Sequence, residues 1–246
     1  MYRMLCALSA AISVLTACIP ADAAKTKDRF YFERLGYAHW QVPTYRKIVA
    51  LTFDDGPDLK YTPQILQLLT NYGDRATFFL IGKKAEQYPD VVRQTALLGN
   101  ELGNHTFSHA NIAHLSTADL TKELDEGKSA IERITGQRCV YFRPPRGYYD
   151  EPSVLTAYRR GYSVIMWSWD EDSRDWAGPS AATIAHSVLN HLHPGDIILL
   201  HDGTANSKQT VAALRIILPE LHRRGYQSVT VTDLLRSADE TDFYAK

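Results

Sequence analysis

Residues 48–57 read Ile48-Val49-Ala50-Leu51-Thr52-Phe53-Asp54-Asp55-Gly56-Pro57, an apolar run that ends in two adjacent carboxylates. The first part is short, uncharged and β-branched, which predicts a buried strand, and Gly56-Pro57 ends it with a turn. Side chains alternate along a strand, so Asp54 and Asp55 point the same way only if the chain bends between them. Taken alone, the two aspartates favour an Asx-type turn that caps the next segment.

Two histidines four residues apart follow about fifty residues later, in the stretch Asn104-His105-Thr106-Phe107-Ser108-His109. Such a pair can reach one ion if the backbone turns between them, and one carboxylate completes a set of three ligands. Three protein ligands leave a coordination position open for water, as in a catalytic zinc site. The pair therefore favours a metal site over a simple turn at the aspartates.

The composition predicts one ordinary globular domain. The chain has 246 residues, of which 45% are hydrophobic, and a formal net charge of -1. This length allows a large single core. The balanced charge gives no support for a nucleic-acid partner. No apolar run after the N-terminus reaches the length of a transmembrane helix.

The first 24 residues have the pattern of an export leader. Arg3 precedes an apolar segment, residues 5–17, that is too short to span a bilayer, and Ala21-Asp22-Ala23 offers small residues for cleavage. An alternative is a bacterial lipobox, which Leu15-Thr16-Ala17-Cys18 resembles, and Cys18 would then be lipidated. Both interpretations predict an exported protein of the periplasm, the cell envelope or the medium. Only the lipobox interpretation adds a membrane contact, through the lipid at Cys18.

Only Cys139 would remain in the mature domain, so no internal disulfide is possible there. Beside Val140-Tyr141-Phe142 it is typical of a small buried strand residue. A reactive thiol is the alternative interpretation.

Strand and helix signals alternate through residues 47–237, which predicts an α/β fold. Seven short apolar runs indicate parallel strands that are covered on both faces; they lie near residues 48–51, 76–82, 101–104, 139–142, 163–167, 197–201 and 228–231. We expect a lead-in over 25–46 that packs outside the domain and a tail over 238–246. Thr62-Pro63 predicts a helix with Thr62 as its N-cap, and Pro219 predicts a kink in the last long helix.

Polar residues follow at least five of these strands. They are Asp54-Asp55, His105, Arg143, the segment 170–175, and His201-Asp202. An open sheet would gather them at one crevice, whereas convergence of many strand ends is typical of a barrel. Of the segment 170–175, residues 170–172 are interpreted as a solvated acidic loop.

At this point a family resemblance becomes visible. The motifs are Thr52-Phe53-Asp54-Asp55-Gly56, His105-Thr106-Phe107-Ser108-His109, Arg143-Pro144-Pro145-Arg146-Gly147, Asp172-Ser173-Arg174-Asp175-Trp176 and Leu199-Leu200-His201. In this order they resemble five motifs of the polysaccharide deacetylases, the NodB-homology group or carbohydrate esterase family 4. The resemblance spans residues 47–235. It implies a distorted (β/α)7 barrel that removes acetyl groups from N-acetylated sugars with a divalent metal, usually Zn²⁺, with Co²⁺, Mn²⁺ or Fe²⁺ as alternatives.

The resemblance also assigns roles by position. It implies Asp55, His105 and His109 as metal ligands and Asp54 as the catalytic base. His201 would be the catalytic acid, oriented by Asp175, and Arg143 would pack beside the base, with Arg75 as a rival partner. These roles agree with the chemistry of amide hydrolysis, which needs an activated water, a base to take its proton and an acid to protonate the leaving amine.

The remaining motif residues would contact substrate. This set comprises Pro145, Arg146, Gly147, Tyr148, Trp176 and Leu199. Trp176 and Leu199 would form the walls around the acetyl methyl, and a backbone N–H near Arg146 would stabilise the oxyanion. Tyr148 would be either a sugar-stacking platform or rim packing. Many family members have Tyr where this chain has Arg146. The Arg-Pro-Pro-Arg-Gly motif is similar to that of the family members that act on peptidoglycan muramic acid, and the Arg146 guanidinium would there meet a lactyl or peptide carboxylate.

The sequence therefore predicts an exported, metal-dependent hydrolase of linear amides that deacetylates a polysaccharide, with peptidoglycan as the favoured substrate. The alternatives are a chitin-oligomer deacetylase and an O-acetyl xylan esterase. A non-catalytic glycan-binding barrel is the alternative of another class. Acetylated polysaccharide is the expected partner, and we expect a monomer.

Overall fold

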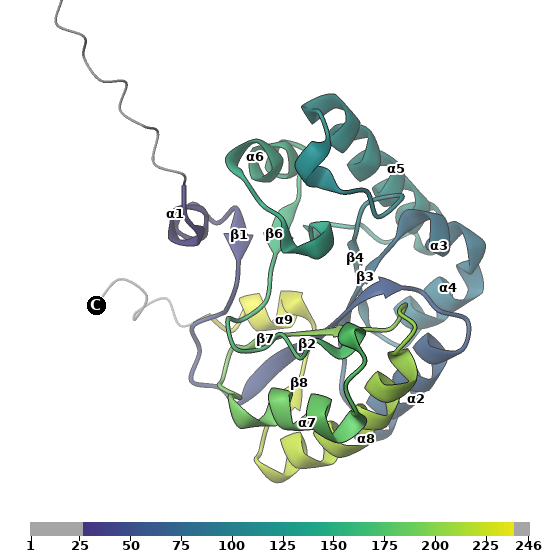
Figure 1. Ribbon diagram of the computed structural model, residues 1–246, viewed down its shortest axis with the longest axis vertical. Coiled ribbons are helices and arrows are strands. Elements are labelled where there is room, and N and C mark those ends of the chain that lie inside the picture. The colour runs from purple at the N-terminus through teal and green to yellow at the C-terminus, as the bar shows by residue number, and fades with distance from the viewer. Residues whose placement is uncertain (1–26, 239–246) are drawn as a thin grey trace, which may run out of the picture.

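The computed structural model describes residues 27–238, so the predicted leader, Cys18 and residues 239–246 lie outside the described residues. Within 27–238 the centre of the fold is one parallel sheet with the strand order β1-β6-β5-β4-β3-β2-β7, and β8 pairs with β2 (Figure 1). The strands are β1 (Ala38–His39), β2 (Ile48–Gly56), β3 (Thr77–Leu80), β4 (Glu101–Asn104), β5 (Tyr141–Phe142), β6 (Ser163–Ile165), β7 (Ile197–His201) and β8 (Gln227–Ser228). The predicted α/β barrel is confirmed, as a curved sheet that is not fully closed.

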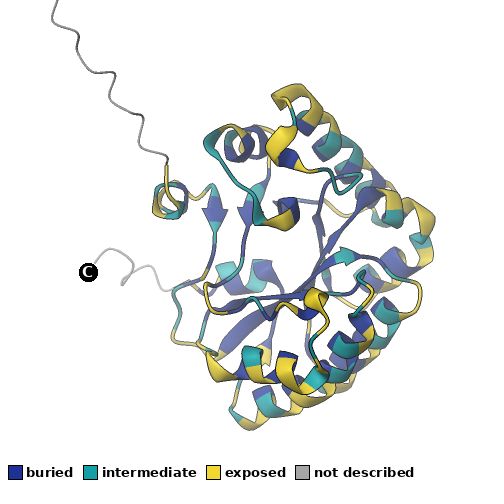
Figure 2. Cartoon of the chain, viewed as in Figure 1, coloured by how far each residue is buried: buried dark blue, intermediate teal, exposed yellow. Residues whose placement is uncertain are grey.

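Helices surround the sheet and turn their apolar sides inward, so the strands are buried and the outer helix faces are exposed (Figure 2). They are α1 (Arg29–Arg34), α2 (Tyr61–Tyr72), α3 (Gly82–Gln87), α4 (Pro89–Leu97), α5 (Thr117–Thr135), α6 (Glu151–Arg159), α7 (Ala181–Asn190), α8 (Ser207–Arg223) and α9 (Val231–Leu235). Ser116 and Ser180 cap α5 and α7, because each hydroxyl accepts from the backbone N–H three residues on. Among the described residues no helix is both long and apolar enough to cross a bilayer.

β2 lies between β3 and β7, in a register that pairs Phe53 with Phe78 and with Leu200. The Phe53 and Phe78 rings stack with centroids 4.9 Å apart in the core. Because all these strands are parallel, their carboxyl ends meet at one edge of the sheet. The sheet is open between β7 and β1, where single bridges from Gln41 to Asp196 and from Asp172 to Leu199 take the place of a ladder.

Several local expectations were wrong. The segment 25–46 does not only pack outside, because Ala38 and His39 form β1 and extend the sheet beside β6. α2 begins at Tyr61, with Lys60 rather than Thr62 at its N-cap. The last long helix is confirmed as α8, with Pro219 inside it.

Cys139 is a buried free cysteine, as predicted. Burial raises the pKa of its thiol far above the ordinary value. The alternative of a reactive thiol is therefore wrong, since the thiolate is the reactive species.

Candidate active site

One cleft of about 540 Å³ opens at the carboxyl ends of the strands. Its lining comes from loops after β2, β4, β5, β6 and β7: Asp54, Asp55, His105, His109, Arg146, Gly147, Trp167, Asp172, Trp176, Leu199, His201 and Thr204. Most of the sequence-predicted site residues thus converge on one cleft, although Asp54 and His201 are 147 residues apart in the chain. Parallel strands explain this convergence.

The chain bends at Asp55, as side-chain alternation requires. The β2–β3 register shifts between Asp54 and Gly56, and Asp55 has a left-handed φ of 69°. Such a backbone is rare for a residue with a Cβ and costs of order 1 kcal/mol. Asp54 is consequently buried at 3% exposure and points inward, while Asp55 faces the histidine loop.

Asp55, His105 and His109 form a three-ligand cluster in which the donor atoms all lie within 4.8 Å of one another. Oδ1 of Asp55 is 3.1 Å from Nε2 of His109 and 3.5 Å from Nε2 of His105. The two histidines converge because Thr106 and His109 both have left-handed backbones, with φ of 65° and 58°. Burial opposes the ionisation of Asp55, yet the two imidazoles lower the pKa of its carboxyl far below the usual range.

The donor set fits a divalent cation. Oδ1 of Asp55 is buried and accepts no hydrogen bond within the described part of the chain. Nδ1 of His105 lies 2.7 Å from the carbonyl oxygen of Arg143. That contact places the proton of a neutral ring on Nδ1, so the lone pair of Nε2 faces Asp55 and is available to a metal.

Asp54 is paired with Arg143, which is completely buried. Nη1 of Arg143 donates to Oδ1 of Asp54 at 2.9 Å and to the Thr52 hydroxyl at 2.7 Å. Its other nitrogens donate to two carbonyl oxygens after β6, at 3.0 and 2.7 Å. A buried guanidinium needs such partners, and here they fix it against the carboxylate. Arg75 is not a rival partner, because it is paired with Asp233 at 3.1 Å.

His201 and Asp175 form the second polar pair of the cleft. Nδ1 of His201 is 2.7 Å from Oδ1 of Asp175, and the His201 backbone N–H donates to the other carboxylate oxygen at 2.8 Å. Burial lowers the pKa of His201, but the hydrogen bond and charge of Asp175, with weaker attraction from Asp54 and Asp55, outweigh it and raise the pKa to about 9. At neutral pH this ring is therefore in its protonated imidazolium form.

Comparisons with known proteins agree with this geometry. A family model described as polysaccharide deacetylase matches residues 41–165. This chain belongs to the polysaccharide deacetylase family. A peptidoglycan-N-acetylglucosamine deacetylase of Bacillus cereus is 46% identical over 204 residues, which is 83% of this chain and 95% of that protein.

Two further similarities concern an oligosaccharide enzyme and a crystal structure. A chitooligosaccharide deacetylase of Azorhizobium caulinodans is 34% identical, over 72% of this chain and 90% of that protein. A crystal structure of a peptidoglycan N-acetylglucosamine deacetylase has a TM-score of 0.81 and 33% identity, over 86% of this chain and 99% of that chain. This polysaccharide deacetylase is therefore a hydrolase that acts on acetylated polysaccharide.

Not every predicted site residue of the deacetylase lines the cleft. Pro145 and Tyr148 do not, and the Tyr148 hydroxyl donates to Asp150 instead. Arg143 and Asp175 lie behind the cleft, where they contact Asp54 and His201. Trp167 and Thr204 line it although no motif singled them out, and the apolar strand pattern around Trp167 gave no signal for such a role.

The acidic stretch 170–172 is not uniformly solvated as predicted. Glu171 is 1% exposed, and neither of its carboxylate oxygens has a hydrogen-bond partner among the described residues. Its backbone N–H donates to Ser168, and its carbonyl accepts from Leu199. Glu171 thus faces inward at the opening of the barrel, and burial, with repulsion from Asp196 and Asp170, raises its pKa to about 9.

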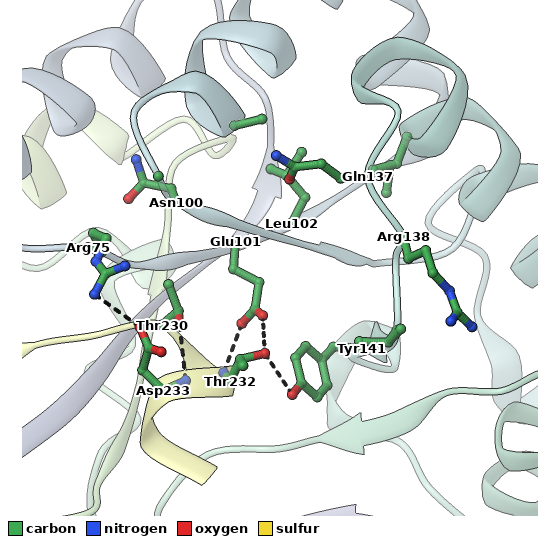
Figure 3. A pocket seen from close by; sticks show the side chains of 14 residues that line it. Arg75, Asn100, Glu101, Leu102, Gln137, Arg138, Tyr141, Thr230, Thr232 and Asp233 are labelled. Atoms are coloured by element: carbon green, nitrogen blue, oxygen red, sulfur yellow. Dashed lines mark hydrogen bonds and ion pairs between the residues drawn. The ribbon is translucent and has the colours of Figure 1, made fainter. Parts of the chain in front are cut away.

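A second pocket, of about 270 Å³, lies at the amino ends of the strands (Figure 3). Its polar side chains satisfy one another: Glu101 accepts from Thr77 at 2.9 Å and from the Thr232 backbone at 3.1 Å, and Tyr141 contacts the Thr232 hydroxyl at 2.9 Å. These bonds dock α9 onto the base of the sheet. The pocket is therefore structural, as the amino-terminal face of a barrel usually is.

Proposed function

We propose that this chain is an exported, metal-dependent N-deacetylase of peptidoglycan. The observation that supports it most strongly is the placement of three groups around one cleft: the Asp55, His105 and His109 cluster, the Asp54–Arg143 pair and the His201–Asp175 pair. Amide hydrolysis needs one group that activates water, one that accepts its proton and one that gives a proton to the leaving nitrogen. The cleft offers each of them once.

Asp55, His105 and His109 would hold the cation, which supplies Lewis-acid chemistry by lowering the pKa of water and polarising the acetyl carbonyl. Asp54 accepts the proton of the attacking water. Its Oδ2 faces the cleft at 3.9 Å from Nε2 of His105, while Oδ1 is held by Arg143. The buried guanidinium holds the carboxylate in one orientation, as a general base requires.

On the other side of the cleft, His201 donates a proton to the departing sugar amine. Asp175 stabilises the imidazolium and fixes the ring, and the Thr210 hydroxyl donates to Asp175 at 2.7 Å. The backbone N–H of Arg146 is the proposed donor to the oxyanion. Leu199 and Trp176 would enclose the acetyl methyl, and the 55% exposure of Trp176 leaves its ring available to a sugar.

Peptidoglycan is the proposed substrate for two reasons. Two of the reported relatives are named as peptidoglycan N-acetylglucosamine deacetylases. In addition, the exposed Arg146 lines the cleft, and a guanidinium there can pair with a lactyl or peptide carboxylate, which chitin lacks. The chitooligosaccharide enzyme supports chitin oligomers as the second candidate. A non-catalytic glycan-binding barrel is disfavoured because all ligand, base and acid residues are present.

The proposal includes the metal and the location. Zn²⁺ is proposed because a set of two histidines and one carboxylate is typical of catalytic zinc, although Co²⁺, Mn²⁺ and Fe²⁺ suit the same ligands. Export to the envelope, by signal cleavage or by lipidation at Cys18, follows from the leader pattern alone. Mass spectrometry of the mature N-terminus distinguishes the two routes.

Acetate release tests the function directly. The enzyme is incubated with peptidoglycan, chitin oligomers and acetylated xylan, with and without a chelator. We expect chelator-sensitive acetate release that is fastest from peptidoglycan. Binding of a glycan without acetate from any substrate, with Zn²⁺ present, would instead identify a binding barrel.

A further inference from the structure

The short helix α3 contacts the loop that holds both histidine ligands. The backbone N–H of Gly82 donates to the carbonyl of Thr106 at 3.0 Å, and that of Lys83 donates to Phe107 at 2.9 Å. A side chain at position 82 would meet Phe107 at 2.6 Å, so only glycine allows this approach. The main chain of α3 thus fixes the loop from His105 to His109.

The next residue of α3, Lys84, contacts the segments that contain Asp55 and Gly203. Nζ of Lys84 donates to the carbonyl oxygen of Asp55 at 2.8 Å and to that of Gly203 at 3.0 Å. Asp55 has the left-handed backbone described above, and such a conformation persists only where its surroundings hold it. An ammonium that donates to the Asp55 carbonyl does so directly.

The two segments that Lys84 joins are in close contact. A Cβ at Gly203 would lie 1.9 Å from the Asp55 carbonyl oxygen, and the Asp202 backbone N–H donates to the Asp54 carbonyl at 3.2 Å. Asp202 is fully buried, accepts from the Thr62 hydroxyl, and interacts electrostatically with Lys84. Lys84 therefore provides the positive charge beside a buried carboxylate as well as two hydrogen bonds.

Lys84 is half-buried and does not line the cleft, so it can affect the reaction only through other residues. We propose that Lys84 is a positioning residue that holds the ligand Asp55 and the loop after His201 in one arrangement and thereby sets the affinity of the site for its metal. This inference rests on the proposed function, because it takes the Asp55, His105 and His109 cluster to be the metal site. It adds a residue that neither the five motifs nor the cleft lining identifies.

The test measures metal affinity rather than turnover. Lys84→Met removes the charge and all donors at nearly the same length, and Lys84→Arg keeps both. Lys122→Met is the matched control, because Lys122 is a lysine with 72% side-chain exposure whose one ion pair within residues 27–238 is with Glu126. Zn²⁺ dissociation constants come from competition with a fluorescent chelator, and the Co²⁺ absorption spectrum reports the ligand geometry. Circular dichroism of each metal-free protein verifies the fold.

We expect Lys84→Met to bind Zn²⁺ about 10- to 100-fold more weakly, which is the usual effect of losing an outer partner of a metal ligand. Its Co²⁺ spectrum should change, while Lys84→Arg recovers most of the affinity and Lys122→Met matches the wild type. A folded Lys84→Met protein with wild-type affinity and spectrum overturns the inference, as does an arginine variant as weak as the methionine variant. If Lys84→Met does not fold, Lys84→Gln is judged by the same criteria.

The outcomes also separate this inference from the proposed function. If the wild type binds no Zn²⁺, or if His105→Ala binds it as tightly as the wild type, the metal site itself is wrong and both proposals fail. If the wild type binds Zn²⁺, His105→Ala does not, and Lys84→Met is unaffected, only the role of Lys84 is refuted.

Discussion

Replacing Asp175 by asparagine should slow the reaction strongly at alkaline pH and leave its rate at low pH nearly unchanged. The pKa of His201 is about 9, against an ordinary value of 6.5; burial opposes this rise, and Asp175 is the main group that causes it. Asparagine keeps the size of the side chain but removes the charge. The His201 imidazolium should then become neutral near or below pH 6.5. Burial lowers its pKa, and in the variant only the weaker attraction of Asp54 and Asp55 opposes that effect.

The size of the effect follows from the two pKa values. At pH 8 about 90% of the wild-type imidazole is protonated for a pKa of about 9, whereas about 3% is protonated for a pKa of 6.5. If the protonated ring is the acid, kcat at pH 8 falls about 30-fold, while at pH 6 the loss of protonated acid is less than about twofold. The alkaline limb of the kcat profile should therefore move down by about 2.5 pH units.

The assay is acetate release from peptidoglycan between pH 5 and 10 with saturating metal. Thr210→Val is the matched control, because it removes the hydroxyl that donates to Asp175 without changing charge, and it should leave the alkaline limb nearly in place. An Asp175→Asn enzyme that is slowed equally at every pH would refute the reasoning. Asp175 would then only position His201, and the proton of the leaving amine would come from another group.

Four further substitutions test other parts of the structure. Asp54→Asn should retain its bound metal, measured by elemental analysis, while the rate of acetate release falls at least about a hundredfold. His105→Ala should lose both the metal and the activity. Loss of metal in the asparagine variant would contradict the separation of the base from the ligands. Arg146→Ala should raise KM for peptidoglycan by about tenfold and leave KM for chitin oligomers nearly unchanged, and equal effects on both would contradict carboxylate recognition. Glu171→Gln should stabilise the fold at alkaline pH. Burial raises the pKa of the Glu171 carboxyl from 4.5 to about 9, so the folded protein binds a proton there that the unfolded chain releases above pH 4.5. The wild type therefore loses stability as pH rises from 4.5 to 9, by about 3 kcal/mol at pH 7. Urea unfolding should show a large difference between variant and wild type at pH 8 and almost none near pH 4.5, and a difference independent of pH would argue against it.

The sequence was most informative where local pattern and tertiary structure agree. Apolar runs located β2, β3, β5, β6 and β7, because a parallel strand covered on both faces has no polar side to alternate. The strand predicted over 228–231 overlaps β8 at Ser228 only, since Val231 begins α9. Strand ends were less certain, and β1 was missed because no apolar run surrounds Ala38 and His39 in the sequence. α3 was missed for a related reason, since Gly82 at its start is unfavourable in a helix by local propensity and is needed for the approach to Phe107.

Partnerships across the sheet were harder to predict than the residues themselves. Arg143 and Arg75 were both reasonable partners for Asp54, and only the order of strands places the first inside the sheet and the second at its base with Asp233. Glu171 was misinterpreted because a run of acidic residues is normally solvated, and its burial depends on the break in pairing between β7 and β1. Such contacts depend on topology, which no local window contains.

Asp54 and Asp55 illustrate how strongly topology decides chemistry. They are neighbours with the same side chain, and nothing in their own sequence distinguishes a base from a ligand. One left-handed residue turns Asp54 toward the buried Arg143 and Asp55 toward two imidazoles, so one carboxylate is paired with a cation and the other is left with a buried oxygen that accepts no hydrogen bond within residues 27–238. The strained backbone must therefore be held for the two roles to stay separate. Lys84, which donates to the carbonyl of Asp55 from a different helix, is the group placed to hold it.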